Sequence, residues 1–339
     1  MDKSELDIST DSNHGGSFRH SFEDIKLLDI LDIRRVVSME EAIKLMEKAF
    51  SSYSKGESYI PQSYVSDLQC LAMDMIYKPV YCEELGKIAM KILTQKQGAP
   101  ISGIPTIVGV VLLLDSKSGE VLSMIDGTYL TALRTGASGG IATQYLARED
   151  AETLAIFGCG AQGFTQLEAV CNARSIKHAM LYDLETSAAA KLKEQMQDKL
   201  DISLSVEKNL GNLRKADVIC TATGSAAPLF SMDEISRGVH INAIGSFKPK
   251  MQEISPQIIQ SCRLFVDSRE AVLKEAGDLI KPIKEGLIQS TIVRDEIGDL
   301  INNECVGRQS PDEITLFKSV GLAVQDLFVA NAVYNSSVS

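Results

Sequence analysis

Residues 154–170, "LAIFGCGAQGFTQLEAV", hold three glycines between an apolar run and a segment with helical spacing of apolar residues. A strand, a G-x-G-x-x-G turn and a helix make up a dinucleotide-binding unit. In such a unit Gly158 makes the tight turn, Gly160 lets the backbone approach a pyrophosphate, and Gly163 lets helix and strand pack closely. We therefore predict that the start of this helix binds the phosphates of a dinucleotide.

An acidic residue stands where such a unit needs one. Asp183 follows Gly163 by 20 residues, in "HAMLYDLE". A carboxylate at the end of the second strand accepts hydrogen bonds from ribose hydroxyls and repels a 2′-phosphate. No arginine follows in the next several residues, so we predict NAD(H) in preference to NADP(H). The alternative, a glycine-rich turn without a ligand, leaves Asp183 unexplained.

The regions around this unit indicate the fold class. Strands and helices alternate from residue 153 to 268, which predicts an α/β fold with a doubly wound parallel (Rossmann) sheet. Residues 60–125 contain short apolar or alternating runs broken by Pro, Gly and Asp, which indicate strands, with a hairpin turn at "KSGE" (117–120). Residues 128–147 indicate a long helix of small residues.

The two ends of the chain also carry helical patterns. Residues 38–56 predict a helix that Ser38 caps and Gly56 ends. The closing stretch "DEITLFKSVGLAVQDLFVANAVYNS" (312–336) is predicted to be one apolar helix, which packs back on the first domain.

The patterns divide the chain into three parts. Residues 1–22 are polar and lack the apolar stretch of a signal peptide, so we expect a disordered tail. We expect residues 23–134 plus 313–339 to form a discontinuous α+β domain. Residues 135–312 form the Rossmann domain.

Composition excludes several classes of protein. A net charge of −11 does not suit nucleic acid, because phosphate binding needs clustered Lys and Arg. The longest apolar run, residues 107–114, is far shorter than the ~20 residues of a membrane span. The four histidines form no metal-ligand spacing. Seven scattered cysteines without C-x-x-C spacing indicate reduced thiols in the cytoplasm, and we take Cys159 as a small residue that the glycine turn tolerates.

Three motifs in one order carry a family resemblance: "DGTYLTALRTGASGG" (126–140), "FGCGAQG" (157–163) and "DEITLFKSVGLAVQDL" (312–327). With them the chain resembles the ornithine cyclodeaminase/mu-crystallin family from about residue 25 to about residue 335. The resemblance implies chemistry with a nicotinamide at the bond between nitrogen and an α-carbon that carries a carboxylate. It also implies that the discontinuous first domain serves substrate binding and dimerisation, in a homodimer whose sheet closes into a barrel across the two subunits.

The resemblance gives Lys91, in "AMKILT", and Arg134, in "TALRTG", the role of contacting the substrate carboxylate. Lys91 is flanked by apolar residues and is costly to bury without an anion, although a lysine that extends its amine to solvent is the alternative. A guanidinium can hold a carboxylate through two parallel hydrogen bonds, and a structural ion pair is the alternative for Arg134.

The resemblance also implies two further groups of contacts. Val320 and Gly321, in "KSVG", match the segment that reaches over nicotinamide and substrate. The implied cofactor contacts are Thr106, Gly158, Gly160, Ala161, Gln162, Gly163, Asp183, Thr221, Thr223, Asn242, Ala243, Ile244 and Gly245.

The chain departs from the family pattern at two places. Family cyclodeaminases carry a catalytic aspartate in a stretch like G-G-D-x-P, whereas "GSFKP" places Phe247 there and offers no carboxylate before Glu253. An arginine of the family, just after a proline, is replaced here by Gln62 or Ser63 in "IPQSYV". One contact with the substrate carboxylate is therefore weaker or supplied elsewhere.

These departures decide which of the possible reactions we favour. Removing a hydride from an amine needs a positioned base, which Phe247 cannot supply. Reducing a protonated cyclic imine needs mainly positioning and a carboxylate clamp. We therefore expect reduction of Δ1-pyrroline-2-carboxylate, or its six-membered analogue Δ1-piperideine-2-carboxylate, to L-proline or L-pipecolate. The alternatives are an ornithine cyclodeaminase, in which Glu253 or a group of the substrate replaces the aspartate, an alanine dehydrogenase, and a non-enzymatic NAD-binding or ligand-sequestering protein.

Overall fold

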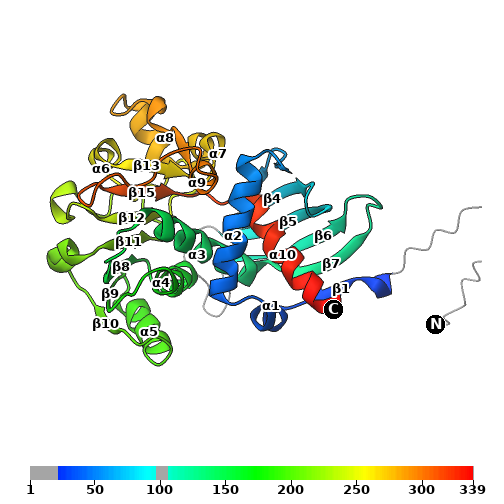
Figure 1. Cartoon of the computed structure of the whole chain (residues 1–339). Helices are drawn as coiled ribbons and strands as arrows, with labels where there is room; N and C mark the ends of the chain where they lie inside the picture. The colour runs from blue at the N-terminus through cyan, green and yellow to red at the C-terminus, as the bar shows by residue number, and fades with distance from the viewer. Residues whose placement is uncertain (1–21, 97–105, 339) are drawn as a thin grey trace, which may run out of the picture.

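The computed structural model describes residues 22–96 and 106–338, so nearly all of the predicted tail lies outside the described residues. Two sheets lie side by side, and helices α2, α3 and α10 lie where they meet (Figure 1). The helices are α1 (Ile30–Val36), α2 (Met39–Ser54), α3 (Gly127–Leu146), α4 (Ala161–Ala173), α5 (Thr186–Met196), α6 (Pro256–Ser261), α7 (Arg269–Glu275), α8 (Gly277–Lys284), α9 (Ile297–Ile301) and α10 (Ala323–Val338).

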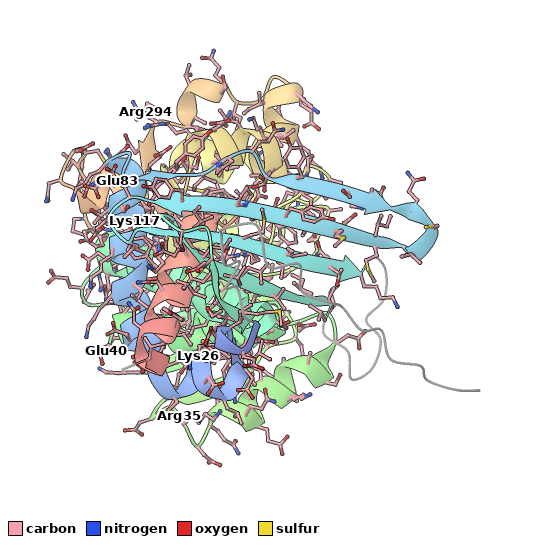
Figure 2. All side chains as sticks on the ribbon, turned by 90° about the vertical axis from the view of Figure 1, so that its right-hand side faces the viewer. Lys26, Arg35, Glu40, Glu83, Lys117 and Arg294 are labelled. Carbon is pink, nitrogen blue, oxygen red and sulfur yellow. The ribbon has the colours of Figure 1, made fainter. Side chains whose placement is uncertain are left out.

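The smaller sheet has the order β1-β7-β6-β5-β4-β2, with β3 also paired to β4. Its strands are antiparallel except for β1, which runs parallel to β7. The strands are β1 (Lys26–Leu28), β2 (Ser58–Tyr59), β3 (Tyr64–Leu68), β4 (Met73–Cys82), β5 (Lys87–Lys96), β6 (Ile107–Asp115) and β7 (Val121–Asp126). The predicted turn at 117–120 joins β6 to β7. Strands of the smaller sheet, in light blue and cyan, extend beyond the body of the molecule in Figure 2.

The larger sheet is entirely parallel, in the order β10-β9-β8-β11-β12-β15-β13-β14. This confirms the predicted α/β fold with a Rossmann-like parallel sheet. The strands are β8 (Thr153–Phe157), β9 (His178–Tyr182), β10 (Ser203–Val206), β11 (Val218–Thr221), β12 (His240–Ala243), β13 (Arg263–Val266), β14 (Asp295–Glu296) and β15 (Thr315–Lys318).

The closing stretch corrects one prediction. Residues 312–336 do not form a single helix: Thr315–Lys318 is the strand β15, and only Ala323–Val338 is helical. A short apolar run buried on both faces has no period of its own, so strand and helix look alike in the sequence. Gly321, with φ +85°, separates the two elements. β15 lies in the larger sheet, and α10 packs on the smaller one. The predicted division into domains stays our proposal.

The predicted helix at 38–56 is α2, and the Ser38 hydroxyl accepts a hydrogen bond from the amide of Glu41 as its cap. The predicted helix at 128–147 is α3, which is buried along most of its length between the two sheets. Charged side chains such as Lys26, Glu40 and Arg294 lie at the periphery (Figure 2). Over residues 22–96 and 106–338, no helix has the length and apolar character to cross a bilayer.

Candidate active site

The glycine turn has the shape that a pyrophosphate needs. Gly158 has φ +89°, a conformation that other residues rarely adopt. A methyl group on Gly163 would collide with the carbonyl oxygen of Gly158, whereas one on Gly160 would meet no atom within 4 Å. No side chain caps α4 at Gly160, so the amides of its first turn, which begins at Ala161, can serve an anion.

Asp183 ties this turn to the neighbouring strand. It follows β9, and its carboxylate accepts hydrogen bonds from the amides of Cys159 at 2.7 Å and Glu185 at 2.9 Å. A carboxylate oxygen can accept two hydrogen bonds and each of these accepts one from the two amides, so both retain capacity for a ribose hydroxyl. Burial, with Asp183 nearby, raises the pKa of the Cys159 thiol to about 12, which fits a structural rather than a reactive cysteine.

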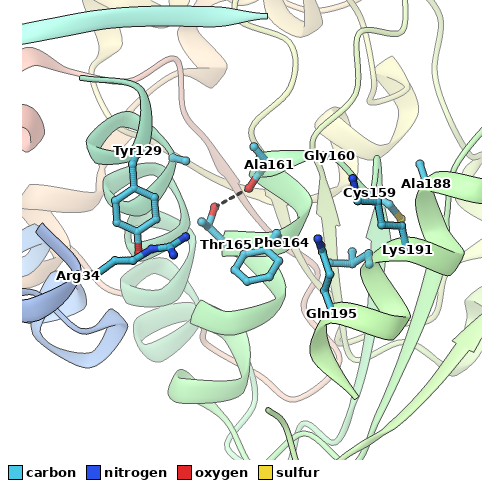
Figure 3. Close-up of a pocket in the computed structure, with 12 residues that line it drawn as sticks. Arg34, Tyr129, Cys159, Gly160, Ala161, Phe164, Thr165, Ala188, Lys191 and Gln195 are labelled. Carbon is cyan, nitrogen blue, oxygen red and sulfur yellow. Dashed lines mark hydrogen bonds between the residues drawn. The ribbon is translucent and has the colours of Figure 1, made fainter. Parts of the chain in front are cut away.

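A pocket of about 460 Å³ borders the turn and the first residues of α4, and residues of α1, α3 and α5 also line it (Figure 3). Gly160 and Ala161 form one wall, and Lys191 of α5 faces it. On the other side the Arg34 guanidinium lies over the ring of Tyr129, 4.7 Å from its centre. The pocket therefore extends the candidate phosphate site with cationic and aromatic groups.

One carboxylate joins the turns that follow β11 and β12. Glu253 accepts hydrogen bonds from the hydroxyl of Thr221 at 2.9 Å and from the amide and hydroxyl of Thr223 at 2.7 and 2.8 Å. It also accepts one from the amide of Ser246 at 3.0 Å, next to Gly245. These turns lie side by side because β11 and β12 are adjacent parallel strands.

Two of the predicted cofactor residues that precede these turns have polar side chains that are fully buried. Thr221 and Asn242 have no exposed surface, and the Asn242 amide donates to Gly139 and Thr143 of α3. Direct contact of these two side chains with a cofactor stays a prediction, and this geometry does not favour it. Thr223 is only partly buried.

The position of the missing aspartate is apolar in the structure too. Phe247 is half-buried and packs against the apolar core beside the larger sheet. Glu253 cannot replace the acid, because its side chain is fully buried and four protein donors occupy its two oxygens. Burial raises the pKa of Glu253.

The predicted clamp residues meet at a third, buried charge. The amine of Lys91 on β5 lies 2.5 Å from one oxygen of Asp326 on α10, and Nε of Arg134 on α3 lies 3.1 Å from the other. Nη1 of Arg134 also donates to Gln325 at 2.9 Å. Arg134 therefore makes the ion pair that was the alternative to substrate binding, but a guanidinium has five N–H donors and the residues that the structure describes engage two of them.

A further cation adds to this cluster. Lys78 on β4 is the register partner of Lys91, and its amine donates to the carbonyl of Gly321 at 2.8 Å. Two buried cations thus share Asp326 with a third cation beside them, and the cluster suits an additional anion. Burial first, and then the charge of Arg134, lowers the pKa of Lys91 to about 7.

The segment at Val320 and Gly321 is held over this cluster. Asp267, after β13, accepts hydrogen bonds from their amides at 2.8 and 2.7 Å and from the Ser319 hydroxyl at 2.7 Å. A side chain on Gly321 would collide with the Arg134 guanidinium, so the glycine lets the segment approach the cluster closely.

Two predicted residues lie elsewhere. Gln62 is exposed between β2 and β3, and Thr106 is exposed immediately before β6. In the ranges that the structure covers, no hydrogen bond joins either to Lys91 or Arg134. Their roles stay predictions.

Sequence reasoning missed Lys78 and Asp326. An aspartate within the apolar run "GLAVQDLFVA" was a signal, because a charge there must be paired if the helix is buried. Lys78 carried no comparable signal, because its nearness to Lys91 depends on the register between β4 and β5.

The chain is similar to known proteins over nearly its whole length. The sequence profile of the ornithine cyclodeaminase/mu-crystallin family matches residues 24–339. A Δ1-pyrroline-2-carboxylate reductase of Bacillus cereus is 38% identical over 307 residues, which cover 90% of this chain and 94% of the relative.

Two solved structures are also similar. The Δ1-pyrroline-2-carboxylate reductase of Thermococcus litoralis, in complex with NADH and L-proline, has a TM-score of 0.89 and 35% identity, covering 92% of this chain and 97% of its own. An archaeal alanine dehydrogenase, described as a dimer with bound NAD, has a TM-score of 0.87 and 33% identity, covering 93% and 96%.

Proposed function

The chain belongs to the ornithine cyclodeaminase/mu-crystallin family, and we propose that it reduces Δ1-pyrroline-2-carboxylate to L-proline with a nicotinamide cofactor. The observation that carries this proposal is the pair of buried cations, Lys91 and Arg134, that share one carboxylate, Asp326. It suits a small substrate with one carboxylate. The relatives named Δ1-pyrroline-2-carboxylate reductase support the choice of substrate.

The residues present fit a dinucleotide. The turn at Gly158, Gly160 and Gly163 has room for a pyrophosphate, and Asp183 retains acceptor capacity for a ribose. The reduced nicotinamide supplies a hydride when bound. The turns after β11, β12 and β15 end at the same edge of the sheet, as ligand sites of such sheets do.

The remaining groups bind and orient the substrate. Lys91 and the free donors of Arg134 hold the substrate carboxylate, which fixes the imine carbon beside the hydride donor. A protonated imine already carries the proton of the product amine. Addition of hydride at carbon therefore completes the reaction without an acid at Phe247.

The same features argue against the main alternative. An ornithine cyclodeaminase must first oxidise an amine, which needs a base near the substrate nitrogen. Phe247 has no basic group, and Glu253 is buried and fully hydrogen-bonded. We therefore place cyclodeamination second.

A substrate panel tests the proposal. Purified protein is assayed with NADH or NADPH against Δ1-pyrroline-2-carboxylate, Δ1-piperideine-2-carboxylate, and pyruvate with ammonia, and with NAD⁺ against L-ornithine. We expect oxidation of NADH with the cyclic imines and no ammonia from ornithine. Ammonia release matching the rate of imine reduction, or turnover of pyruvate alone, would overturn the proposal. Oxidation of NADH by none of them would favour a binding protein.

We further propose a preference for NAD(H), carried by Asp183. Its carboxylate lies at the end of β9, where a 2′-phosphate would be repelled. Asp183→Ala should weaken NADH binding by about tenfold, or ~1.4 kcal/mol, and leave NADPH binding unchanged or tighter. Fluorescence titration of both cofactors measures this. Tighter NADPH than NADH binding by the unaltered protein would contradict the assignment.

We also propose that the protein is a homodimer that closes a barrel through the smaller sheet. One row of residues crosses five strands of that sheet on the face opposite Lys91 and is apolar throughout: Leu27, Pro79, Met90, Leu112 and Met124. Large exposed apolar patches mark interaction surfaces. The dimer described for the similar archaeal alanine dehydrogenase supports this.

A further inference from the structure

Two contacts from β4 cross between the two sheets. The carboxylate of Asp74 pairs with the amine of Lys248 at 2.6 Å, and the amine of Lys78 donates to the carbonyl of Gly321 at 2.8 Å. Asp74 and Lys78 point to the same face of β4 because they are an even number of residues apart, on the side that also carries buried Ile76. One strand of the smaller sheet thus holds two segments of the larger one.

Both segments belong to the candidate active site. Lys248 follows Phe247 in the turn after β12, and Gly321 lies in the segment after β15. Strands β12 and β15 are adjacent and parallel, so these segments leave the same edge of the sheet. This is the edge where the nicotinamide is expected.

The same strand is also fixed to the carboxylate clamp. Lys78 is the register partner of Lys91, so the backbone hydrogen bonds between β4 and β5 set where the Lys91 amine lies. A shift of β4 relative to the larger sheet would therefore move the clamp relative to both segments.

We propose that β4 sets the distance between the hydride donor and the substrate clamp, and that Asp74 and Lys78 are positioning residues for hydride transfer. This inference rests on the proposed reduction and adds residues that act without touching the reacting atoms. Asp74 is 9% exposed and Lys248 23%, so water weakens their ion pair little, and removing Asp74 takes from the largely buried Lys248 amine its carboxylate partner.

The test compares Asp74→Asn, Lys248→Met, their double variant and Lys78→Met in the full chain. A displacement of about 1 Å at a reacting centre costs on the order of 10²-fold in rate, so we expect kcat with Δ1-pyrroline-2-carboxylate to fall about 10- to 100-fold. The Kd for NADH should stay within about twofold, because the glycine turn is intact. The pair acts as a unit, so removing both partners should cost little more than removing one. We expect the kcat of the double variant to lie within about threefold of the kcat of the slower single variant.

Controls separate positioning from general damage. Lys248→Arg keeps the charge and should restore most of the activity. Lys87→Met and Asp115→Asn remove an ion pair of similar exposure between β5 and β6, 3.2 Å long, and should leave kcat within about twofold.

Hydrogen exchange gives a readout that needs no substrate. Amides of residues 244–251 and 319–322 should exchange faster in the β4 variants, while α4 is unchanged. Unaltered kcat together with unaltered exchange in these segments would overturn the inference. If the unaltered protein reduces no cyclic imine, the proposed function fails, and the exchange data alone decide whether β4 holds the two segments.

Discussion

Lys91 is the residue whose chemistry depends most on its neighbours. Its amine has a pKa lowered to about 7, because burial and the charge of Arg134 oppose its protonation more than Asp326 favours it. A lysine is charged below its pKa and neutral above it. The ability of Lys91 to hold a carboxylate is therefore present at acidic and neutral pH and is lost as the pH rises past about 7.

A pH profile checks this. Above pH 7 we expect kcat/KM for the imino acid to fall by up to about tenfold per pH unit, since this ratio reports the free enzyme. The substrate imine also titrates, so the inhibition constant of pyrrole-2-carboxylate, which has no basic nitrogen, is measured in parallel and should rise over the same range. In Lys91→Arg the side chain stays charged, and the rise should vanish. An inhibition constant that is flat to pH 9 in the unaltered protein would contradict the assignment.

Asp326 is the counter-charge of the whole cluster. Asp326→Asn leaves Lys91 and Arg134 buried without a carboxylate, and we expect the free energy of unfolding to fall by about 3–5 kcal/mol. Urea unfolding measures the change. Glu40→Gln, which removes the exposed pair with Lys44 on α2, is the control and should show no measurable change. An equal free energy of unfolding for Asp326→Asn and the unaltered protein would show that Lys91 and Arg134 do not need the Asp326 charge to stay buried.

Residues differ in how far the sequence identifies them. Lys91 and Arg134 stand in motifs that point to a carboxylate, so their presence in one cluster could be anticipated. Lys78 could not, because its nearness to Lys91 depends on the register between β4 and β5. The pairing with Asp326 depends on how α10 packs, which no local pattern contains.

At the scale of elements, the βα unit from β8 to α4 follows its sequence pattern closely. Glycine spacing and the apolar run predict it because a tight turn and close helix packing tolerate few other residues. β15 is the opposite case. Its four residues are fully buried, and only pairing with β12 and β13 distinguishes it from a helical turn.

We expect alanine substitutions at two glycines of the turn to have different effects, one on stability and the other on NADH binding. Gly163→Ala places a methyl group on the carbonyl oxygen of Gly158, and we expect a loss of about 1–3 kcal/mol of stability from overpacking. Gly160→Ala meets no protein atom within 4 Å, so the fold should keep its stability while NADH binding weakens about tenfold or more. Urea unfolding and fluorescence titration separate the two effects. NADH binding by Gly160→Ala equal to that of the unaltered protein would mean that the pyrophosphate lies elsewhere.

At the scale of the whole molecule, alternation of strands and helices was enough to predict the parallel sheet, because each strand needs a crossover helix before its parallel neighbour. The sequence predicts the strands of the smaller sheet but not the apolar face that they form together. Its outward residues are as apolar as its inward ones, and only the register shows that they form one continuous row.

That row makes the oligomeric state testable. Leu112 lies in the middle of it, between Met90 and Met124, and Met124 is 39% exposed in the single chain. A glutamate at Leu112 would bury a charge without a partner if two sheets meet there, so Leu112→Glu should dissociate the dimer. Light scattering after size exclusion should give twice 36.9 kDa for the unaltered protein and 36.9 kDa for the variant.

The matched control introduces the same charge away from the sheet. Leu287 is 49% exposed, in the turn after α8, and Leu287→Glu should leave the dimer intact. In the proposed dimer the barrel would close over the side of the sheet opposite Lys91, so we expect dissociation also to lower imine reduction, through looser strands β4 and β5. A monomeric unaltered protein with full activity would refute both the dimer and its role in holding the clamp, whereas a dimer that survives Leu112→Glu would place the contact on another surface.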